Sequence, residues 1–358
     1  MSDEQPSRRS FLIASGAIVA GSAALGGFLA EVHKKSTSAA KAVMRKLPTS
    51  YSSAAPLPSD PAVTIDGLSP LITPTKDFFR IDTAFDIPNI DVNSWKLVVD
   101  GMVDQLLTFT YDEILAMPMI EVDCTIGCVS NEVGGDLVGN ARWLGVKLSE
   151  VLAKAKPQTN ADQVLSVSSD GFSAGFPFQN AFDRDAIIAV AMNGQPLTAE
   201  HGYPVRLVVP GLYGYVSATK WLTEITITRF DQKKGFWITR GWSELGPVKT
   251  ESRIDNFKQG QAVAAQPTKI AGVAWAPTRG ITKVEVRIDD GPWQSATLGP
   301  QINADTWRQW WIDWTPTSGK RRITVRATDG SGYTQTSKAA TVEPDGATGW
   351  HSLVVNVT

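Results

Sequence analysis

The sequence predicts an α+β domain followed by a β-sandwich of immunoglobulin type, on three observations. From Trp95 to about residue 230, short β-type runs alternate with modest helical patterns at Tyr111–Ala116 and Lys147–Lys154. After the low-complexity stretch Gly260–Thr268, only strand patterns remain. A chain of 358 residues is long enough to bury two cores. We therefore expect a signal or anchor at 1–30, a linker at 31–60, the α+β domain at 61–259 and the sandwich at 260–358.

The amino terminus has the pattern of an export signal. Ser7-Arg8-Arg9-Ser10-Phe11-Leu12 precedes an uncharged apolar stretch from Ile13 to Ala30. Paired arginines followed by Phe and Leu indicate the twin-arginine pathway, and an ordinary signal peptide that carries two arginines is the alternative. The stretch is marginally long enough to serve as a membrane tether, although its Gly and Ala content makes it a weak one. We expect a protein in the periplasm or on the outer face of the cytoplasmic membrane.

The charge balance bears on the class of partner, and the proline content bears on where the folded part begins. The chain has 34 Lys and Arg against 36 Asp and Glu, so it lacks the positive excess that favours a nucleic acid partner. Prolines are frequent between residues 47 and 75 and favour an extended segment, so we expect the folded part to start near residue 60.

The carboxyl-terminal region is rich in strand patterns and in tryptophan. Asp290-Gly291 and Asp329-Gly330 supply hairpin turns between alternating runs. Most of the chain's tryptophans fall here, and we expect them in the core of this domain. Adjacent Trp310 and Trp311 must point to opposite sides of a strand, so one of them should face a partner surface. These features favour a homodimer through this domain.

Both cysteines lie in the segment 124–136, Cys-Thr-Ile-Gly-Cys-Val-Ser-Asn-Glu-Val-Gly-Gly-Asp. The polar, glycine-rich turn after Cys128 suits a thiolate that binds a soft metal or acts as a nucleophile, whereas Cys124 fits a buried neutral thiol. A disulfide between the two is the structural alternative in an exported protein. Three histidines without ligand spacing give little support for zinc. Catalysis by Cys128 together with His201 stays open.

A second polar cluster lies between residues 201 and 221. Its members are three potential cations and two hydroxyl groups: His201, Arg206, Lys220, Ser217 and Thr219. Together they would form a clamp for an anion such as the phosphate of a cofactor. The alternative is that Arg206 and Lys220 form surface ion pairs with Glu200 and Glu224.

Eight short motifs follow one another along the chain: Phe-Phe-Arg80, Cys128-Val-Ser-Asn131, Ala141-Arg-Trp143-Leu-Gly-Val, Ser169-Asp170-Gly171, Met192-Asn-Gly-Gln-Pro-Leu197, His201-Gly-Tyr-Pro-Val-Arg206, Val209-Pro-Gly211 and Lys220-Trp221. Their types and order resemble the sulfite oxidase family of molybdopterin enzymes, over roughly residues 60–358. That family also carries an immunoglobulin-like domain after its catalytic domain, as expected here.

The resemblance implies a molybdenum–molybdopterin cofactor and a role for each matching residue. Cys128 would ligate molybdenum beside the two sulfurs of a single pterin dithiolene. Arg80 would hold an anionic or oxo-bearing substrate near the metal. The residues expected to hold the pterin and its phosphate are Asn131, Asp170, His201, Arg206, Ser217, Thr219 and Lys220.

Three departures from the family pattern bear on the substrate. The family's Arg-Asn-His is replaced by Arg80-Ile81-Asp82. The tyrosine expected beside the metal falls on Val190, which leaves Tyr213 or Tyr215 to substitute for it. Glu132-Val133 stand where animal and plant sulfite oxidases have paired arginines, which argues against sulfite itself.

We therefore expect an exported molybdopterin-dependent oxidoreductase that transfers an oxygen atom, with two electrons, on a small sulfite-like oxyanion, S-oxide or N-oxide. The chain has no haem motif, so a separate haem- or quinone-linked carrier would exchange the electrons near Trp237, Arg240 and Trp242. Those tryptophans fit packing between domains equally well. The alternative from another class is a cell-surface binding protein with a decayed metal site and a Cys124–Cys128 disulfide.

Overall fold

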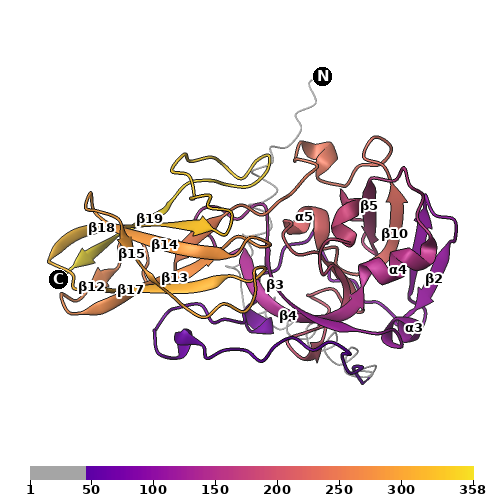
Figure 1. Cartoon of the computed structure of the whole chain (residues 1–358), viewed down its shortest axis with the longest axis horizontal. Helices are drawn as coiled ribbons and strands as arrows, with labels where there is room; N and C mark the ends of the chain where they lie inside the picture. The colour runs from indigo at the N-terminus through magenta and orange to yellow at the C-terminus, as the bar shows by residue number, and fades with distance from the viewer. Residues whose placement is uncertain (1–45) are drawn as a thin grey trace, which may run out of the picture. The chain divides into compact units, whose positions relative to one another are not determined.

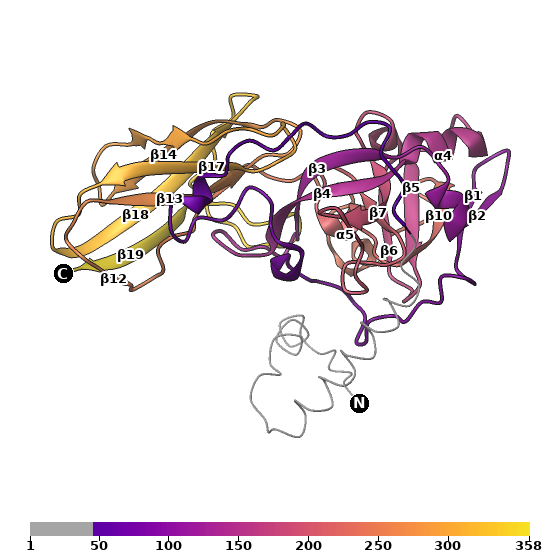
Figure 2. The same cartoon turned by 90° about the horizontal axis from the view of Figure 1, so that it is seen from below.

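The computed structural model describes residues 46–358, and the predicted export signal, with the apolar stretch 13–30, lies outside them. The described residues cluster as one unit. Four sheets make up this unit, two in each half of the molecule (Figures 1 and 2). Among residues 46–358, no helix is both long and apolar enough to cross a membrane.

The first sheet of the amino-terminal half has the strand order β2-β1-β10-β5-β6. Its strands are β1 (Lys96–Gly101), β2 (Leu107–Thr110), β5 (Gln163–Ser168), β6 (Ser173–Pro177) and β10 (Leu222–Thr228). β1 and β10 run parallel, while the other neighbours are antiparallel. The period-two pattern of β1, with Leu97 and Val99 fully buried, places one face of this sheet against the core.

The second sheet carries the segments that matter for function. Its strands are β3 (Ile120–Gly127), β4 (Val138–Lys147), β7 (Ile187–Met192) and β8 (Gln195–Pro196), and β9 (Arg206–Val208) pairs with the same strand β7. Every residue of β7 is buried, because its Ile-Ile-Ala-Val-Ala-Met run is apolar on both faces. β3 and β9 thus lie on opposite sides of the strands β4 and β7, of which β7 is fully buried.

Among residues 46–358 the helices are few and short, so this part of the chain is mostly β and the α+β prediction overstated its helical share. They are α3 (Tyr111–Leu115), α4 (Leu148–Ala155), α5 (Gly214–Ser217) and the 3₁₀ turns η1 (Pro61–Val63), η2 (Thr75–Asp77), η3 (Phe178–Ala181) and η4 (Ile238–Arg240). The two helices predicted from sequence are confirmed as α3 and α4. Thr110 and Glu113 form the capping box that starts α3.

The carboxyl-terminal half is a β-sandwich of two sheets. One has the order β11-β13-β17-β16 and the other β12-β19-β18-β14-β15. The strands are β11 (Glu251–Ile254), β12 (Ala262–Val263), β13 (Thr268–Trp275), β14 (Ile281–Ile288), β15 (Gln294–Ser295), β16 (Thr297–Leu298), β17 (Arg308–Trp314), β18 (Gly319–Asp329) and β19 (His351–Val357). Apolar residues of both sheets fill the space between them. β11 precedes the expected boundary at 260, and the immunoglobulin type of the sandwich stays a prediction.

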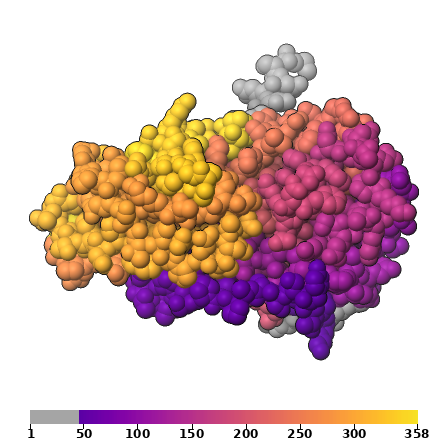
Figure 3. Space-filling view, viewed as in Figure 1, coloured from indigo at the N-terminus to yellow at the C-terminus, as the bar shows by residue number. Residues whose placement is uncertain are grey.

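Residues 46–75 pack against both halves and begin their contacts before the expected start near residue 60. Ser52 forms a parallel bridge with Ile120. We call residues 60–71 the strap; Figure 3 shows this region of the chain, in indigo, along both halves. Ile65 of the strap shares an apolar cluster with Trp311, one of the two adjacent tryptophans of which the sequence predicted that one would face a partner surface. The chain itself therefore covers Trp311, and Trp310 is fully buried.

Candidate functional site

Cys128 directly follows β3 and begins a closed loop, residues 128–137, which we call the thiol loop. The Cys128 N–H donates to Leu137 O at 2.9 Å, and the Asn131 N–H donates to Cys128 O at 3.0 Å. Asn131 Oδ1 accepts the Leu137 N–H at 2.8 Å. Asn131, expected to contact a cofactor, thus fixes the shape of the loop that presents the thiol.

Both cysteines are free thiols, so the predicted Cys124–Cys128 disulfide of the alternative hypothesis is wrong. Cys124 packs in the apolar cluster around Trp143. Cys128 is buried, and its Sγ lies 3.4 Å from the Ser130 N–H. Burial raises the pKa of the Cys128 thiol, while the Ser130 N–H acts in the opposite direction. A buried thiol of this kind ionises readily only when a cation takes the place of its proton, as a metal does.

β9 and the turn before it bring the three predicted cations together. Arg206 Nη1 donates to His201 O at 3.3 Å. Gly202 has a φ of +103°, and a Cβ at this position would lie within 3.1 Å of both Arg206 and Lys220. Only glycine fits this close approach without strain. Burial and the charge of Arg206 lower the pKa of His201 to about 4, so its neutral ring donates Nε2–H to Thr75 O, 2.9 Å away.

Arg206 is a buried cation without an anionic partner among residues 46–358. Its side chain is 5% exposed and its Nε has no hydrogen-bond partner there. Besides His201 O, its guanidinium reaches only Ala218 O, at 3.3 Å, and the Trp143 ring, 4.9 Å away. Burial lowers the pKa of Arg206 to about 10. Such a buried charge costs free energy unless an anion compensates it.

Lys220 lies beside Arg206 and shares a carboxylate with Arg80. Lys220 Nζ and Arg80 Nε both lie 2.7 Å from Asp82 Oδ2. Although burial opposes the shift, hydrogen bonds from both cations hold the pKa of Asp82 below its usual value. Burial lowers the pKa of Lys220 to about 8. The alternative of surface pairs with Glu200 and Glu224 is therefore wrong, and Arg80 lies at the edge of the same cation cluster.

The three remaining predicted residues hold local structure. Ser217 Oγ donates to Tyr213 O at 3.0 Å, within the short helix α5. The hydroxyls of Thr219 and Ser166 lie 2.7 Å apart and are fully buried. The Asp170 carboxylate accepts the backbone N–H two residues further on at 3.1 Å, which shapes an exposed turn. Ser217 and Thr219 thus position the segment between Arg206 and Lys220.

Of the two tyrosines expected to replace the family tyrosine, Tyr213 lies beside Cys128. A Cβ on Gly127 would lie 3.8 Å from the Tyr213 ring, whereas Tyr215 OH donates to Ser243 O at 2.6 Å. Burial raises the pKa of both phenols. The fully buried Val190 lies on β7.

The aromatic segment after residue 235 extends from Tyr215. The Tyr215 and Trp242 rings lie 5.9 Å apart, and Trp242 lies 6.2 Å from Trp237. Trp242 is 8% exposed, and the next residue donates its N–H to Pro344 O at 3.0 Å. Trp242 is therefore buried beside a backbone contact with the carboxyl-terminal half, while Trp237 and Arg240 reach the surface.

The β-sandwich supports the thiol loop, a role that local sequence patterns did not indicate. Arg253 Nη1 donates to Gly135 O at 2.8 Å and its Nε is paired with Asp255 at 2.6 Å. A side chain at Gly134, whose φ is +80°, would collide with the His351 ring. Contacts with β11 and β19 thus add to the bonds within the loop that hold its shape. No local pattern in the sequence singles out Arg253, because Glu-Ser-Arg-Ile of β11 does not alternate between polar and apolar residues.

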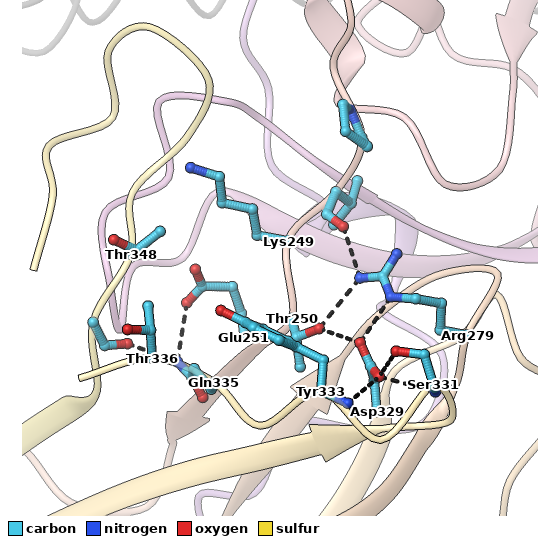
Figure 4. A pocket seen from close by; sticks show the side chains of 13 residues that line it. Lys249, Thr250, Glu251, Arg279, Asp329, Ser331, Tyr333, Gln335, Thr336 and Thr348 are labelled. Atoms are coloured by element: carbon cyan, nitrogen blue, oxygen red, sulfur yellow. Dashed lines mark hydrogen bonds and ion pairs between the residues drawn. The ribbon is translucent and has the colours of Figure 1, made fainter. Parts of the chain in front are cut away.

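A cavity of about 380 Å³ opens next to these contacts (Figure 4). Lys249, whose N–H donates to Tyr213 OH at 3.4 Å, lines it together with Glu251. Figure 4 shows Asp329 and Arg279 on its wall, paired at 2.8 Å. Glu251 is only 5% exposed, and burial raises its pKa to about 8. The cavity therefore has a carboxyl group that holds a proton at neutral pH.

These features fit a cofactor that joins a soft metal to a phosphate. Cys128 supplies one buried sulfur ligand, and Arg206 supplies a buried cation whose Nε lacks a partner within residues 46–358. Lys220 adds a second cation next to it. Sulfur is the ligand that molybdenum-type centres favour, and guanidinium groups bind phosphate oxygens in pairs.

Comparisons with known proteins agree with this chemistry. Residues 84–237 match the family described as the oxidoreductase molybdopterin binding domain. The mitochondrial sulfite oxidase of Homo sapiens is 30% identical over 67% of this chain and 52% of its own length. The uncharacterized oxidoreductase YuiH of Bacillus subtilis is 33% identical over 45% of this chain and 79% of its own length. The chain thus spans about half the length of the sulfite oxidases it matches.

The same architecture occurs in a solved structure. The sulfane dehydrogenase SoxCD from Paracoccus pantotrophus aligns with a TM-score of 0.69 over 89% of this chain and 91% of that chain. The two sequences are 22% identical, so this match shows a shared fold.

Proposed function

Because this chain belongs to the sulfite oxidase family of molybdopterin-dependent oxidoreductases, we propose that it catalyses two-electron oxygen-atom transfer on a small substrate. The observation that carries this proposal is the buried, unbridged Cys128 thiol, held in a fixed loop in a fold that also buries the unpaired Arg206. Molybdopterin, when bound, supplies the oxygen transfer and the two-electron redox change.

The residues of the chain hold and orient this cofactor in the proposal. Cys128 supplies the protein's sulfur ligand to molybdenum, and Asn131 fixes its loop through the 2.8 Å bond to Leu137. Arg206 and Lys220 bind the phosphate, which neutralises the buried guanidinium. His201, neutral at pH 7, donates to Thr75 O and so holds the turn η2 against the cation cluster.

The charges near the site favour a neutral or singly charged substrate. Arg80, the residue proposed to hold the substrate, already shares Asp82 with Lys220. Glu132 and Val133 on the thiol loop add no positive charge. Because a dianion such as sulfite needs several unpaired cations, an S-oxide or N-oxide is the better candidate. Tyr213 is our candidate for the phenol next to the reacting atoms.

We also propose that the enzyme works outside the cytoplasm and exchanges electrons with a separate haem- or quinone-linked carrier. The support is the Arg8-Arg9 pair before the apolar stretch 13–30, and the absence of a haem motif from the sequence. Trp237 and Arg240, which reach the surface, are the candidate contact for this carrier.

The test combines metal content with activity. Protein made in a host that synthesises the cofactor should contain about one molybdenum per chain and reduce or oxidise at least one of a set of S-oxides, N-oxides and sulfite with artificial electron carriers. Cys128→Ser should lose the activity, whereas Cys124→Ser, which changes the thiol four residues earlier on β3, should keep most of it. A fully active Cys128→Ser protein, or a wild type that is folded but takes up no molybdenum, would refute the proposal.

A further inference from the structure

A second hollow, of about 350 Å³, lies on the β-sandwich away from the cations described above. Strands β14, β18 and β19 supply its floor, and the thiol loop supplies one wall. The lining residues that matter are Arg287, Arg322, Thr324, Ser352, Trp350 and Val133. They contribute two cations, two hydroxyls and no carboxylate.

The strand register aligns these groups across the floor. Arg287 on β14 faces Thr324 on β18, and Thr324 faces Ser352 on β19. The hydroxyls of Thr324 and Ser352 lie 3.0 Å apart, so one donates to the other and the second hydrogen remains free to bind a ligand. The side chains of Arg287, Thr324 and Ser352 therefore lie side by side across three neighbouring strands.

The two carboxylates that flank Arg287 in the chain, Glu285 and Asp289, are already paired with other cations, and Asp289 lies 3.1 Å from Arg321 Nη1. Glu285 lies 2.9 Å from Arg326 and 2.7 Å from Lys283. Burial opposes ionisation of Glu285, but the bonds from these two cations keep its pKa below the usual value. Glu285 therefore leaves no charge to compensate Arg287, which is two residues further along β14.

Among residues 46–358, neither guanidinium group of the two arginines of the hollow forms an ion pair. Arg287 Nε is buried without a hydrogen-bond partner there, and its guanidinium lies 4.8 Å from the Trp293 ring and 5.6 Å from the Trp350 ring. The aromatic rings hold the guanidinium in place without neutralising it. Arg322 uses only its backbone N–H, which donates to Asp289 at 2.8 Å. The hollow thus combines a fixed buried donor with an exposed cation.

We propose that this hollow binds a tetrahedral oxyanion, a sulfate or a phosphate group. Four acceptor oxygens match the forked donors of two arginines and the free hydroxyl hydrogen, whereas a planar carboxylate would leave donors unused. Val133, which lines the hollow, is five residues after Cys128 on the thiol loop. The bound anion therefore contacts the loop that presents the thiol. The proposal does not depend on the oxidoreductase activity, because binding is measured without turnover.

Calorimetric titration of the cofactor-loaded full chain, in which the phosphate site at Arg206 and Lys220 is filled, tests the proposal with sulfate and with phosphate, at constant ionic strength kept with chloride. We expect saturable binding of one anion per chain, and binding weakened about tenfold or more in Arg322→Met and in Arg287→Met. Lys320→Met is the matched control, because it removes the same charge from the same strand outside the hollow. It should change the affinity less than about twofold.

Two further measurements separate the possible results. Arg287→Lys keeps the charge and should bind more tightly than Arg287→Met, which distinguishes anion binding from a folding defect. A phosphate monoester, glycerol 3-phosphate, identifies the source: tighter binding than inorganic phosphate indicates a phosphate group on a larger molecule, and weaker binding indicates the free ion. Equal affinity in wild type and Arg322→Met, equal losses in Arg322→Met and Lys320→Met, or no saturable binding would each overturn the proposal.

Discussion

Replacing Arg206 by Met should stabilise the cofactor-free protein and abolish cofactor binding. Burial lowers the pKa of Arg206 from 12.5 to about 10. At about 1.4 kcal/mol per unit, the charged form costs the fold about 3 kcal/mol at every pH below 10. The two bonds to carbonyl oxygens and the Trp143 ring return part of this, about 1–2 kcal/mol. Methionine fills a similar volume without the charge, so the unfolding free energy should rise by about 1–2 kcal/mol.

The assay is urea unfolding of protein made in a host without the cofactor, together with molybdenum analysis of protein from a competent host. Arg142→Met is the matched control, for which we expect the opposite change in unfolding free energy. Arg142 is bound through two 2.8 Å contacts to the buried Asp123, which the substitution would leave unpaired. This variant should lose about 2 kcal/mol or more. If Arg206→Met loses as much stability as Arg142→Met, or still takes up molybdenum, the assignment of Arg206 as an unpaired phosphate ligand is refuted.

Three further predictions concern pH and the thiol loop. His201 has a pKa of about 4 in the fold against 6.5 when unfolded, so the unfolded state binds more protons between these values. Up to about 3 kcal/mol of unfolding free energy is therefore lost as the pH falls from 6.5 to 4. His201→Gln should flatten the plot of unfolding free energy against pH in this window. Glu251 has a pKa of about 8 against 4.5, so stability is lost as the pH rises from 4.5 to 8. Glu251→Gln should be more stable than wild type at pH 8.5, by up to about 5 kcal/mol, and nearly equal to it at pH 4.5. Arg253→Met removes the 2.8 Å bond to Gly135 and should release the cofactor about fivefold faster than wild type in dialysis, whereas Arg229→Met, which breaks an exposed ion pair, should not. Unchanged pH curves, or equal release rates, would contradict the respective prediction.

Periodicity predicts strands of which one face is buried. In the carboxyl-terminal half, where only strand patterns were expected, β13 and β14 have core residues such as Ile270 and Val284 fully buried. Periodicity says nothing about long-range docking of proline-rich segments. The proline-rich stretch 47–75 was therefore predicted as an extended segment, with the folded part starting near residue 60, whereas Ser52 already forms a bridge with Ile120 and Ile65 packs in a cluster with Trp311.

Part of the site could be predicted because it depends on local sequence. Cys128 and the cations at 201, 206 and 220 lie in short motifs whose residue types and order resemble those of a known family. Their partners come from distant segments: Thr75 is 126 positions from His201, and Arg253 is 118 positions from Gly135. Spacing cannot indicate such contacts. The disulfide alternative failed because β3 holds Cys124 in the apolar cluster while Cys128 turns into the loop.

The strap has a practical consequence for recombinant fragments. Asp60 accepts Gln309 Nε2 at 2.8 Å, and the Ser69 N–H donates to Asp255 at 3.0 Å, so the strap joins strands that a fragment of residues 84–237 would lack. Such a fragment would also lose Thr75, leave the buried His201 ring without its acceptor and expose apolar surface around Trp143. The span recognised by the family comparison is thus not autonomous, and we expect it to precipitate on expression unless the segments on either side are kept.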